Sequence, residues 1–271
     1  MSRRVNFFRP QSICTDADVQ AFMAATGITD PTIDMAICNL VAQLKADNLW
    51  NKLDAIYPMV GGSATTHKFN LKNPSDTNAA FRLLFSGGWT HDANGATPNG
   101  VNAWANTFWK PYQRTNTLNI SFGFSSQTQN QTVTQVFGCA SGVVFASMGL
   151  AVLAAPNGGW SIVGNHTAIL FSNFATTGFF LIRSTGTTFR EVYRNGISLS
   201  INTTTSPSAT LPGDVTFTFG ARRINAVTTQ FYTTHKMAFG FLGATQLTNA
   251  DALALSSAEA AFQTALGRYI L

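Results

Sequence analysis

The feature that most restricts the fold is a long series of short apolar segments bounded by glycine, asparagine or proline. From about residue 67 onward these segments are rich in Phe, Val, Ile and Thr. Residues 118–124 alternate apolar with small or polar side chains, as a half-buried strand does. No helical pattern intervenes, which is typical of an antiparallel sandwich or barrel and not of a parallel α/β sheet. Turn signals stand at residues 86–88, 92–95, 99–100, 157–159, 195–196 and 212–214.

Helical patterns are confined to the two ends of the chain. The stretch 15–18 offers a capped start for one helix, which Gly27 ends, and residues 29–31 start a second helix. Thr248 begins a C-terminal helix, with Asp251 in the place of the usual glutamate of a capping box. We therefore predict a basic N-terminal arm at 1–14, a helical attachment segment at 15–62, and a β-sandwich with a closing C-terminal helix at 63–271.

The sharpest local signal is the segment Phe189–Leu199, in which Asn195 and Gly196 separate two strand-like halves. Asn-Gly favours the two positive φ angles of a type I′ hairpin turn. This hairpin, a strand ending at Gly220, a strand at 236–242 and the helix start at 247–251 follow one another in an order that resembles the laminin-G-like, concanavalin A-like jelly roll. The resemblance implies a mainly β fold, an antiparallel jelly-roll β-sandwich with N-terminal helices and a C-terminal helix.

A second group of motifs resembles the lead-in segment of jelly-roll virion proteins from tailed and crAss-like phages. The motifs lie at residues 53–62, 67–74, 79–83, 87–89 and 99–103. The resemblance implies a virion location, assembly in the host bacterial cytoplasm, and a homo-oligomer that contacts sister copies and other virion proteins. The basic residues Arg3, Arg4 and Arg9 are the expected attachment or oligomer contacts.

Composition excludes several partners. Charged residues make up 11% of the chain, against roughly 25% in ordinary domains, so the net charge of +5 reflects scarce acids. Lys and Arg are not concentrated along one face or helix, so no nucleic-acid partner is expected. The most apolar run, residues 143–155, is shorter than the roughly 20 residues of a membrane helix, so no membrane insertion is expected.

The cysteines and histidines show no metal or cofactor pattern. Cys14, Cys38 and Cys139 have neither the spacing of a metal site nor the even number of a disulfide framework. We expect them to be reduced and to have buried side chains, as in a protein that assembles in a reducing cytoplasm. The four histidines are widely separated in the sequence, whereas a zinc site needs several clustered ligands, so no metal site is expected. No Walker or Rossmann glycine pattern is present, so no cofactor is expected.

Acids for glycan cleavage are also scarce. Retaining glycosidases need two carboxylates about 5 Å apart. The only glutamates are Glu191 and Glu259, and neither has an acid two or four residues away. Glu191 is expected at the strand surface as a partner of Arg190 or Arg194. We therefore predict that the chain is not an enzyme. One alternative is a glycan hydrolase or lyase with unrecognised site residues, which turnover lost on changing Glu191 or Asp214 would favour.

The loop between Trp89 and Trp109 carries the side chains that sugar sites commonly use, aromatic faces beside polar groups. The candidate ligand-binding residues are Trp89, His91, Asn94, Asn102, Trp104 and Trp109. Tryptophans of this kind also pack into cores and subunit interfaces, and that interpretation stays open. The leading prediction is a non-enzymatic phage virion structural protein (a capsid, head-fibre or tail component) that displays a lectin-like domain for glycan or host-surface adhesion. A free-standing carbohydrate-binding lectin is the other alternative.

Overall fold

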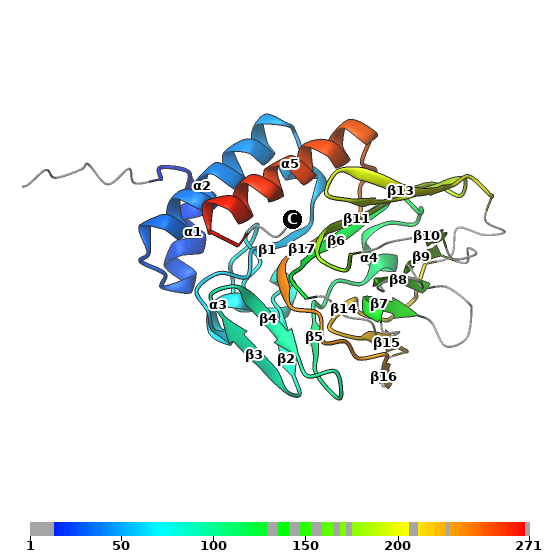
Figure 1. Cartoon of the computed structure of the whole chain (residues 1–271), viewed down its shortest axis with the longest axis horizontal. Helices are drawn as coiled ribbons and strands as arrows, with labels where there is room; N and C mark the ends of the chain where they lie inside the picture. The colour runs from blue at the N-terminus through cyan, green and yellow to red at the C-terminus, as the bar shows by residue number, and fades with distance from the viewer. Residues whose placement is uncertain are drawn as a thin grey trace, which may run out of the picture.

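Two sheets and a few helices make up the chain, which we describe from a computed structural model (Figure 1). The mainly β fold predicted from the sequence is confirmed at this level. The described residues are 14–128, 135–140, 147–152, 159–164, 169–171, 175–205, 211–225 and 228–268.

The first sheet is antiparallel throughout, and its central strands come from distant parts of the chain. β6 lies between β11 and β17, and the far side of β17 pairs with both β4 and β1. In sheet order the strands are β13 (Ile197–Asn202), β12 (Phe189–Arg194), β11 (Gly178–Thr185), β6 (Ile120–Ser126), β17 (Met237–Gly243), β4 (Gly95–Pro98) and β3 (Trp89–Asp92), with β1 (Ala55–Tyr57) also beside β17.

The second sheet is antiparallel along its main path, and its one parallel pair joins β15 to β7. Its strands are β10 (Ile169–Phe171), β9 (Gly159–Gly164), β8 (Ser147–Val152), β7 (Gln135–Ala140), β14 (Thr218–Phe219), β5 (Trp104–Asn106) and β2 (Leu84–Ser86), with β15 (Arg222–Ile224) and β16 (Thr228–Gln230) off this path.

A buried apolar core lies between the two sheets. Alternate residues of β6 enter it, Phe122 and Phe124 among them, and Phe219 of the second sheet meets them from the other side. The ring of Tyr57 packs edge-on against that of Phe219, with centroids 5.6 Å apart. Because burial of one Phe side chain contributes roughly 1.5–3 kcal/mol, this core is the main reason why the two sheets stay face to face.

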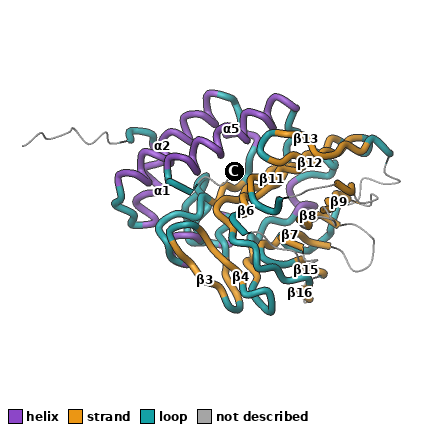
Figure 2. The backbone as a smooth tube through the Cα atoms, viewed as in Figure 1, coloured by secondary structure: helices purple, strands orange, loops and turns teal. Residues whose placement is uncertain are grey.

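Three long helices cover the outer face of the first sheet. Figures 1 and 2 show α1 (Ala17–Thr26), α2 (Pro31–Ala46) and α5 (Asn249–Ala265) gathered on one side of the molecule. Together with Phe179, Leu181, Phe239 and Phe241 of the sheet, they form a second apolar core. The N-terminal helices therefore pack on their own sandwich, and β1, which falls inside the predicted attachment segment 15–62, is a strand of the first sheet.

The predicted helix starts and hairpin are confirmed. Asp16 accepts hydrogen bonds from the backbone N–H groups of Asp18 and Val19, and Asp30 accepts one from Thr32. Thr248 and Asp251 form a reciprocal capping box at the start of α5. Asn195 and Gly196 have φ angles of 49° and 78°, so both central positions of the hairpin turn take the positive φ that Asn-Gly allows.

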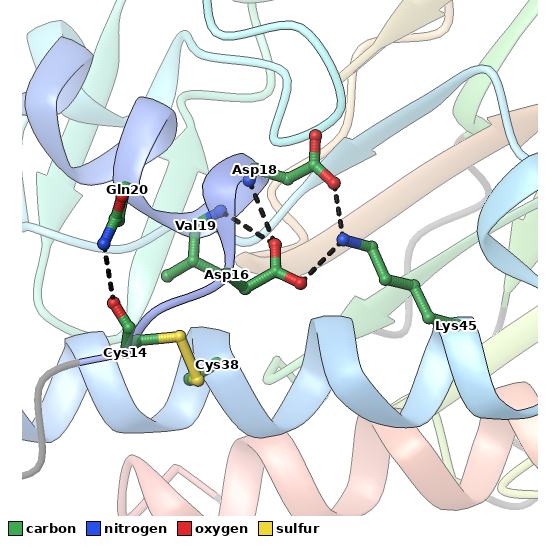
Figure 3. The surroundings of a disulfide bond; sticks show 7 residues. All are labelled: Cys14, Asp16, Asp18, Val19, Gln20, Cys38 and Lys45. Atoms are coloured by element: carbon green, nitrogen blue, oxygen red, sulfur yellow. Dashed lines mark hydrogen bonds and ion pairs between the residues drawn. A yellow bond between two sulfur atoms is a disulfide. The ribbon is translucent and has the colours of Figure 1, made fainter.

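Two of the three cysteines form a disulfide, so the prediction of reduced cysteines is wrong for this pair. Figure 3 shows Cys14, which precedes α1, bonded to Cys38 on α2, where their Cα atoms lie 5.9 Å apart. Beside it, Lys45 Nζ lies 2.7 Å from Asp16 and 2.6 Å from Asp18. An odd number of cysteines does not prevent one pair from forming, and the packing of α1 on α2 brings these two together. Cys139 is a buried free thiol.

The four shorter helical turns connect the strands and complete the description. They are the 3-10 turns η1 (Trp50–Lys52) and η2 (Asn78–Ala80) and the short helices α3 (Ala64–His67) and α4 (Pro111–Arg114). In the described ranges, none of the helices has both the length and the apolar character needed to cross a membrane. Arg3, Arg4 and Arg9 lie outside the described residues.

Candidate functional site

The structure divides the candidate ligand residues among three places. Trp89 and His91 lie on β3 and stack with ring centroids 6.2 Å apart, and Phe85 of β2 contacts both rings edge-on. The indole N–H of Trp89 donates to the carbonyl oxygen of Ser86 at 3.1 Å. These rings pack on one another and fasten β2 to β3.

His91 also contacts His67, although the two histidines are far apart in the sequence. The Nδ1 atoms of His67 and His91 lie 2.9 Å apart, although 24 positions separate the residues in sequence. Burial and the neighbouring His91 ring lower the pKa of His67 to about 3. Nε2 of His67 is buried with no hydrogen-bond partner in the part of the chain that the structure describes. In those residues, no group of three or more His, Cys, Asp or Glu side chains could hold a metal ion.

Asn94, Asn102 and Trp104 mainly hold local structure. The backbone N–H of Asn94 donates to Asp92 Oδ1 at 2.8 Å in the β3–β4 turn. The side-chain oxygen of Asn102 accepts from the backbone N–H of Gly88 at 3.1 Å. Trp104 of β5 is half-buried, and the guanidinium of Arg223 lies over its ring, 4.8 Å from the ring centroid.

Trp109 is fully buried, so its prediction as a ligand-contacting residue is wrong. Its ring packs edge-on against Phe217 in the core, with centroids 6.2 Å apart. The indole N–H, however, donates to Asp54 Oδ2 at 2.8 Å. The tryptophan therefore positions an acid that the sequence analysis did not select, and that acid lines an open groove.

This groove, called the Asp54 groove below, has a volume of about 310 Å³. Four segments meet around it: η1 with the residues after it, the turn at residues 70–73, the end of η2, and α4. It contains one carboxylate, two cations, side-chain amides and an aromatic ring. The polar and aromatic residues that line it are Asn51, Asp54, Asn70, Lys72, Asn73, Phe81 and Arg114.

Asp54 and Arg114 form the ion pair at one side of the groove. Arg114 Nη2 donates to Asp54 Oδ1 at 2.7 Å, and the same guanidinium lies 5.4 Å from the centroid of the Phe81 ring. Phe81 has a φ of 58°, a left-handed conformation that is uncommon for a bulky residue. The fold therefore holds this ring at the groove despite a local backbone cost, which makes Phe81 a feature of interest for function.

Buried Asn70 fixes the turn that forms the floor. Its Oδ1 accepts from the backbone N–H groups of Ile56 at 2.9 Å and Lys72 at 3.1 Å. Its Nδ2 donates to the carbonyl oxygens of Ala80 at 3.0 Å and Asp54 at 3.3 Å. One side chain thus ties three walls of the groove together, because β1, the turn and η2 all depend on it.

Lys72 supplies the second cation. Its ammonium donates to the carbonyl oxygen of Trp50 and lies 4.7 Å from the centroid of the Trp50 ring. Burial lowers the pKa of Lys72, because an ammonium loses hydration in this partly enclosed position. The groove therefore pairs Asp54 with Arg114 and leaves Lys72 bonded to a neutral carbonyl.

The other open hollows offer less chemistry. The largest, about 610 Å³, lies between the α1–α2 connection and Gly61-Gly62; Asp30 is its only charged lining residue, and no ring lines it. A groove of about 310 Å³ between α2 and α5 is lined by small, apolar and amide residues around Phe262. Neither combines a ring with charged hydrogen-bonding groups. A further hollow beside Phe179, Glu259 and Arg268 does so, but its volume of about 20 Å³ holds no more than a water molecule, so the Asp54 groove is the best candidate site.

Glu191 lies in a closed cluster and not at the strand surface, which corrects the sequence prediction. It accepts hydrogen bonds from Arg183 Nη2, the Tyr193 hydroxyl and the Ser198 hydroxyl, each at 2.6 Å. Its ion-pair partner is Arg183 of β11 and not Arg190 or Arg194. Asp214, the other acid considered for catalysis, is exposed and paired with Lys110.

Four groove residues were not predicted from the sequence: Asp54, Lys72, Phe81 and Arg114. The first three fall inside the motifs at 53–62, 67–74 and 79–83, which carried the resemblance to the lead-in segment of jelly-roll virion proteins. A usable signal was the presence of charged residues among many amides in a chain that has few charges. That signal does not show that residue 114 joins the same site, because only the folded chain brings α4 to Asp54.

No known family matches the chain, and no curated protein matches it. Solved structures do match. Trypanosoma rangeli sialidase in complex with 2,3-difluoro-KDN is 14% identical, with a TM-score of 0.55 over 82% of this chain and 39% of that chain. A structure of botulinum neurotoxin type C, titled for the dependence of its cell entry on two ganglioside molecules, is 11% identical, with a TM-score of 0.53 over 79% of this chain and 53% of that chain.

These similarities show the fold, and the chain spans only about 39% and 53% of the two matched chains. The similar structures belong to a glycan-processing enzyme and to a toxin whose cell entry depends on gangliosides. None of those reported is a phage protein, so the comparisons give no support to the predicted virion role.

The prediction that the chain is not an enzyme is contradicted. Several similar structures are of the T. rangeli sialidase, one as a covalent intermediate, one with the inhibitor DANA and one as a mutant with trans-sialidase activity. The prediction rested on the spacing of acids along the sequence, which does not measure their separation in the fold. It is therefore not retained.

Proposed function

We propose that this chain binds carbohydrate in the Asp54 groove. The observation that carries the proposal is the meeting of an aromatic ring, a carboxylate, a guanidinium and several amides in one open groove of about 310 Å³. A small-molecule site typically combines aromatic side chains with a small number of convergent polar groups, which fix the orientation of the ligand and provide specificity.

Each group has a role that sugar chemistry can use. Asp54 can accept a hydrogen bond from a sugar hydroxyl at the Oδ1 side, since the N–H groups of Trp109 and Arg114 use most of its other acceptor positions and hold its carboxylate in place. Asn51 and Asn73, which are both exposed, can donate and accept. The Phe81 ring, over which the Arg114 guanidinium lies, adds an apolar wall to the groove that a C–H group of a sugar can contact. Binding at such an open site should be weak for one copy.

The comparisons support this proposal at the level of fold. The matched sialidase and neurotoxin structures place glycan-related proteins among those with a similar arrangement of strands. We further assign the sandwich to the concanavalin A-like jelly-roll class, supported by the antiparallel first sheet and the Asn195-Gly196 hairpin. A virion location, sister-copy and virion-protein contacts and host-surface adhesion remain proposals, which mass spectrometry of purified phage particles would test.

The test is a glycan array followed by titration calorimetry with the full chain. Asp54→Asn removes the charge and keeps the shape, and it should weaken binding at least tenfold because charge-assisted hydrogen bonds are worth about 1.5–3 kcal/mol. The matched control is Asp214→Asn, which makes the same change at an acid outside the groove. Equal binding by both variants would reject the groove.

Glycan cleavage is measured in the same samples by following release of reducing ends. Turnover that Asp54→Asn removes would show that the groove is catalytic as well as binding. Absence of binding to every glycan, with the wild-type chain shown to be folded by circular dichroism, would reject the proposed function.

A further inference from the structure

We infer that the Asp54 groove selects a sugar that carries a carboxylate, with Lys72 as the counter-cation. This inference rests on the proposed function and adds the chemical class of the ligand.

The first support comes from the surroundings of the lysines. In the described parts of the chain, Lys72 is the one lysine with no carboxylate within ion-pair distance. Every other lysine has one: Lys45 pairs with Asp16 and Asp18, Lys52 with Asp251, Lys68 with Asp76, Lys110 with Asp214, and Lys236 with Asp92. In a chain with so few charges, an unmatched ammonium in a groove marks a place for an anion.

The second support is the charge of the groove itself. Its charged lining residues are one acid, Asp54, and two cations, Lys72 and Arg114, which leaves one positive charge. Asp54 already has Arg114 and the Trp109 N–H as partners. Its carboxylate is therefore engaged, and the remaining charge belongs to Lys72.

The third support is the partial burial of the ammonium. Lys72 is half-buried, its pKa is lowered by that burial, and one of its three N–H groups bonds to the neutral carbonyl of Trp50. An incoming carboxylate would restore the lost solvation through a short charge-assisted hydrogen bond. One unmatched positive charge fits a singly charged carboxylate better than a doubly charged phosphate ester.

The experiment compares matched neutral and acidic sugars by titration calorimetry. The pairs are sialyllactose with lactose, glucuronic acid with glucose, and galacturonic acid with galactose; sulfated lactose is a further arm. We expect at least one acidic member to bind tenfold or more tightly than its neutral partner, with a preference that shrinks as salt rises from 20 to 150 mM.

Variants then assign the preference to Lys72. Lys72→Gln should reduce acidic-sugar binding tenfold or more, to near the level of the neutral partner, and should reduce neutral-sugar binding much less, so that the ratio of acidic to neutral binding falls toward one. Lys72→Arg should keep most of the preference, because it keeps the charge. Lys110→Gln, at a paired lysine outside the groove, should have no effect. Thermal melting of each variant confirms that it is folded.

The outcomes are distinct. Equal binding of neutral and acidic partners would overturn the inference and leave the proposed carbohydrate site intact. Stronger binding of sulfated lactose than of every carboxylate sugar would overturn the carboxylate class. Binding of no sugar at all would reject the proposed function and this inference with it.

Discussion

The Asp54 groove and the Glu191 cluster are built from the same kinds of side chain. Each pairs an acid with an arginine, and each places that arginine over aromatic rings: Arg114 over Phe81, and Arg183 over Phe189 and Tyr193. They differ in access to solvent. The side chains of Glu191 and Arg183 are 5% and 11% exposed, whereas those of Asp54 and Arg114 are 16% and 40% exposed.

This difference separates stability from binding. Glu191 uses its oxygens on three protein donors, so the cluster holds β11, β12 and β13 together and offers nothing to a ligand. The groove leaves Arg114 and the amides in contact with solvent, so its ion pair adds little to folding but remains available. The same chemistry therefore serves the fold in one place and a candidate site in the other.

The strongest challenge to this comparison is Glu191→Ala. Removing one partner of a buried ion pair leaves Arg183 buried and unpaired, which typically costs 3–5 kcal/mol. We expect the free energy of unfolding to fall by about that amount in urea denaturation. Glu191→Gln, which keeps a hydrogen-bond acceptor, should cost less. A loss below about 1 kcal/mol for the alanine variant would show that the closed cluster is not structurally important.

Glu259 sharpens the comparison, because it is a buried acid with no ion-pair partner among the described residues. It accepts hydrogen bonds from Ser125 and Gln263, and burial raises its pKa from 4.5 to about 7. The folded state then binds a proton that the unfolded state has released, so stability should fall as pH rises from about 4.5 to 7. The expected loss is about 3 kcal/mol.

Denaturation series at pH 5 and pH 8 measure this effect. Glu259→Gln should flatten the pH dependence and make the variant more stable than the wild type at pH 8. A wild-type stability that rises over this pH range and keeps the same slope in the variant would contradict the assignment.

Removal of the Cys14–Cys38 disulfide tests whether the Asp54 groove depends on the packing of the N-terminal helices. The two are connected because α2 leads into η1, which lies at the groove. Replacing both cysteines by serine should cost about 2–4 kcal/mol through loss of the cross-link in the unfolded chain. Below the melting temperature, glycan binding should stay unchanged. Loss of binding by a folded double variant would show that the groove depends on this cross-link.

The smallest stability effect is expected for Arg114→Gln. Because this arginine is partly exposed, loss of its ion pair should change the free energy of unfolding by less than about 1 kcal/mol. Glycan binding should still fall about fivefold or more, since Asp54 loses the group that orients it. A large stability loss with unchanged binding would reverse the distinction between the two clusters.

The parts of the fold that depend on neighbouring residues could be predicted from the sequence. Asp16, Asp30 and Thr248 cap the helices that they were expected to start, and Asn195-Gly196 forms its hairpin turn. Caps and tight turns are set by two to four residues, so their signals survive in the sequence whatever the rest of the chain does.

The site could not be predicted in the same way. A tryptophan among asparagines has one sequence pattern whether it faces a ligand or the core, and Trp109 faces the core. Asp54, Lys72 and Arg114 meet only because tertiary folding brings distant segments together. For the same reason, the separation of acids along the chain was a poor basis for excluding catalysis, and an odd number of cysteines a poor basis for excluding a disulfide.

The position of β17 has a consequence for the order of folding. This strand, at residues 237–243, joins β6 on one side to β1 and β4 on the other, so the first sheet stays split until the ribosome has released those residues. Until then α1 and α2 lack Phe239, Phe241 and α5, which complete the core beneath them. Such late, long-range closure makes for slow folding. During that interval the Cys14–Cys38 bond, once formed, would keep α1 and α2 paired until β17 and α5 complete their core.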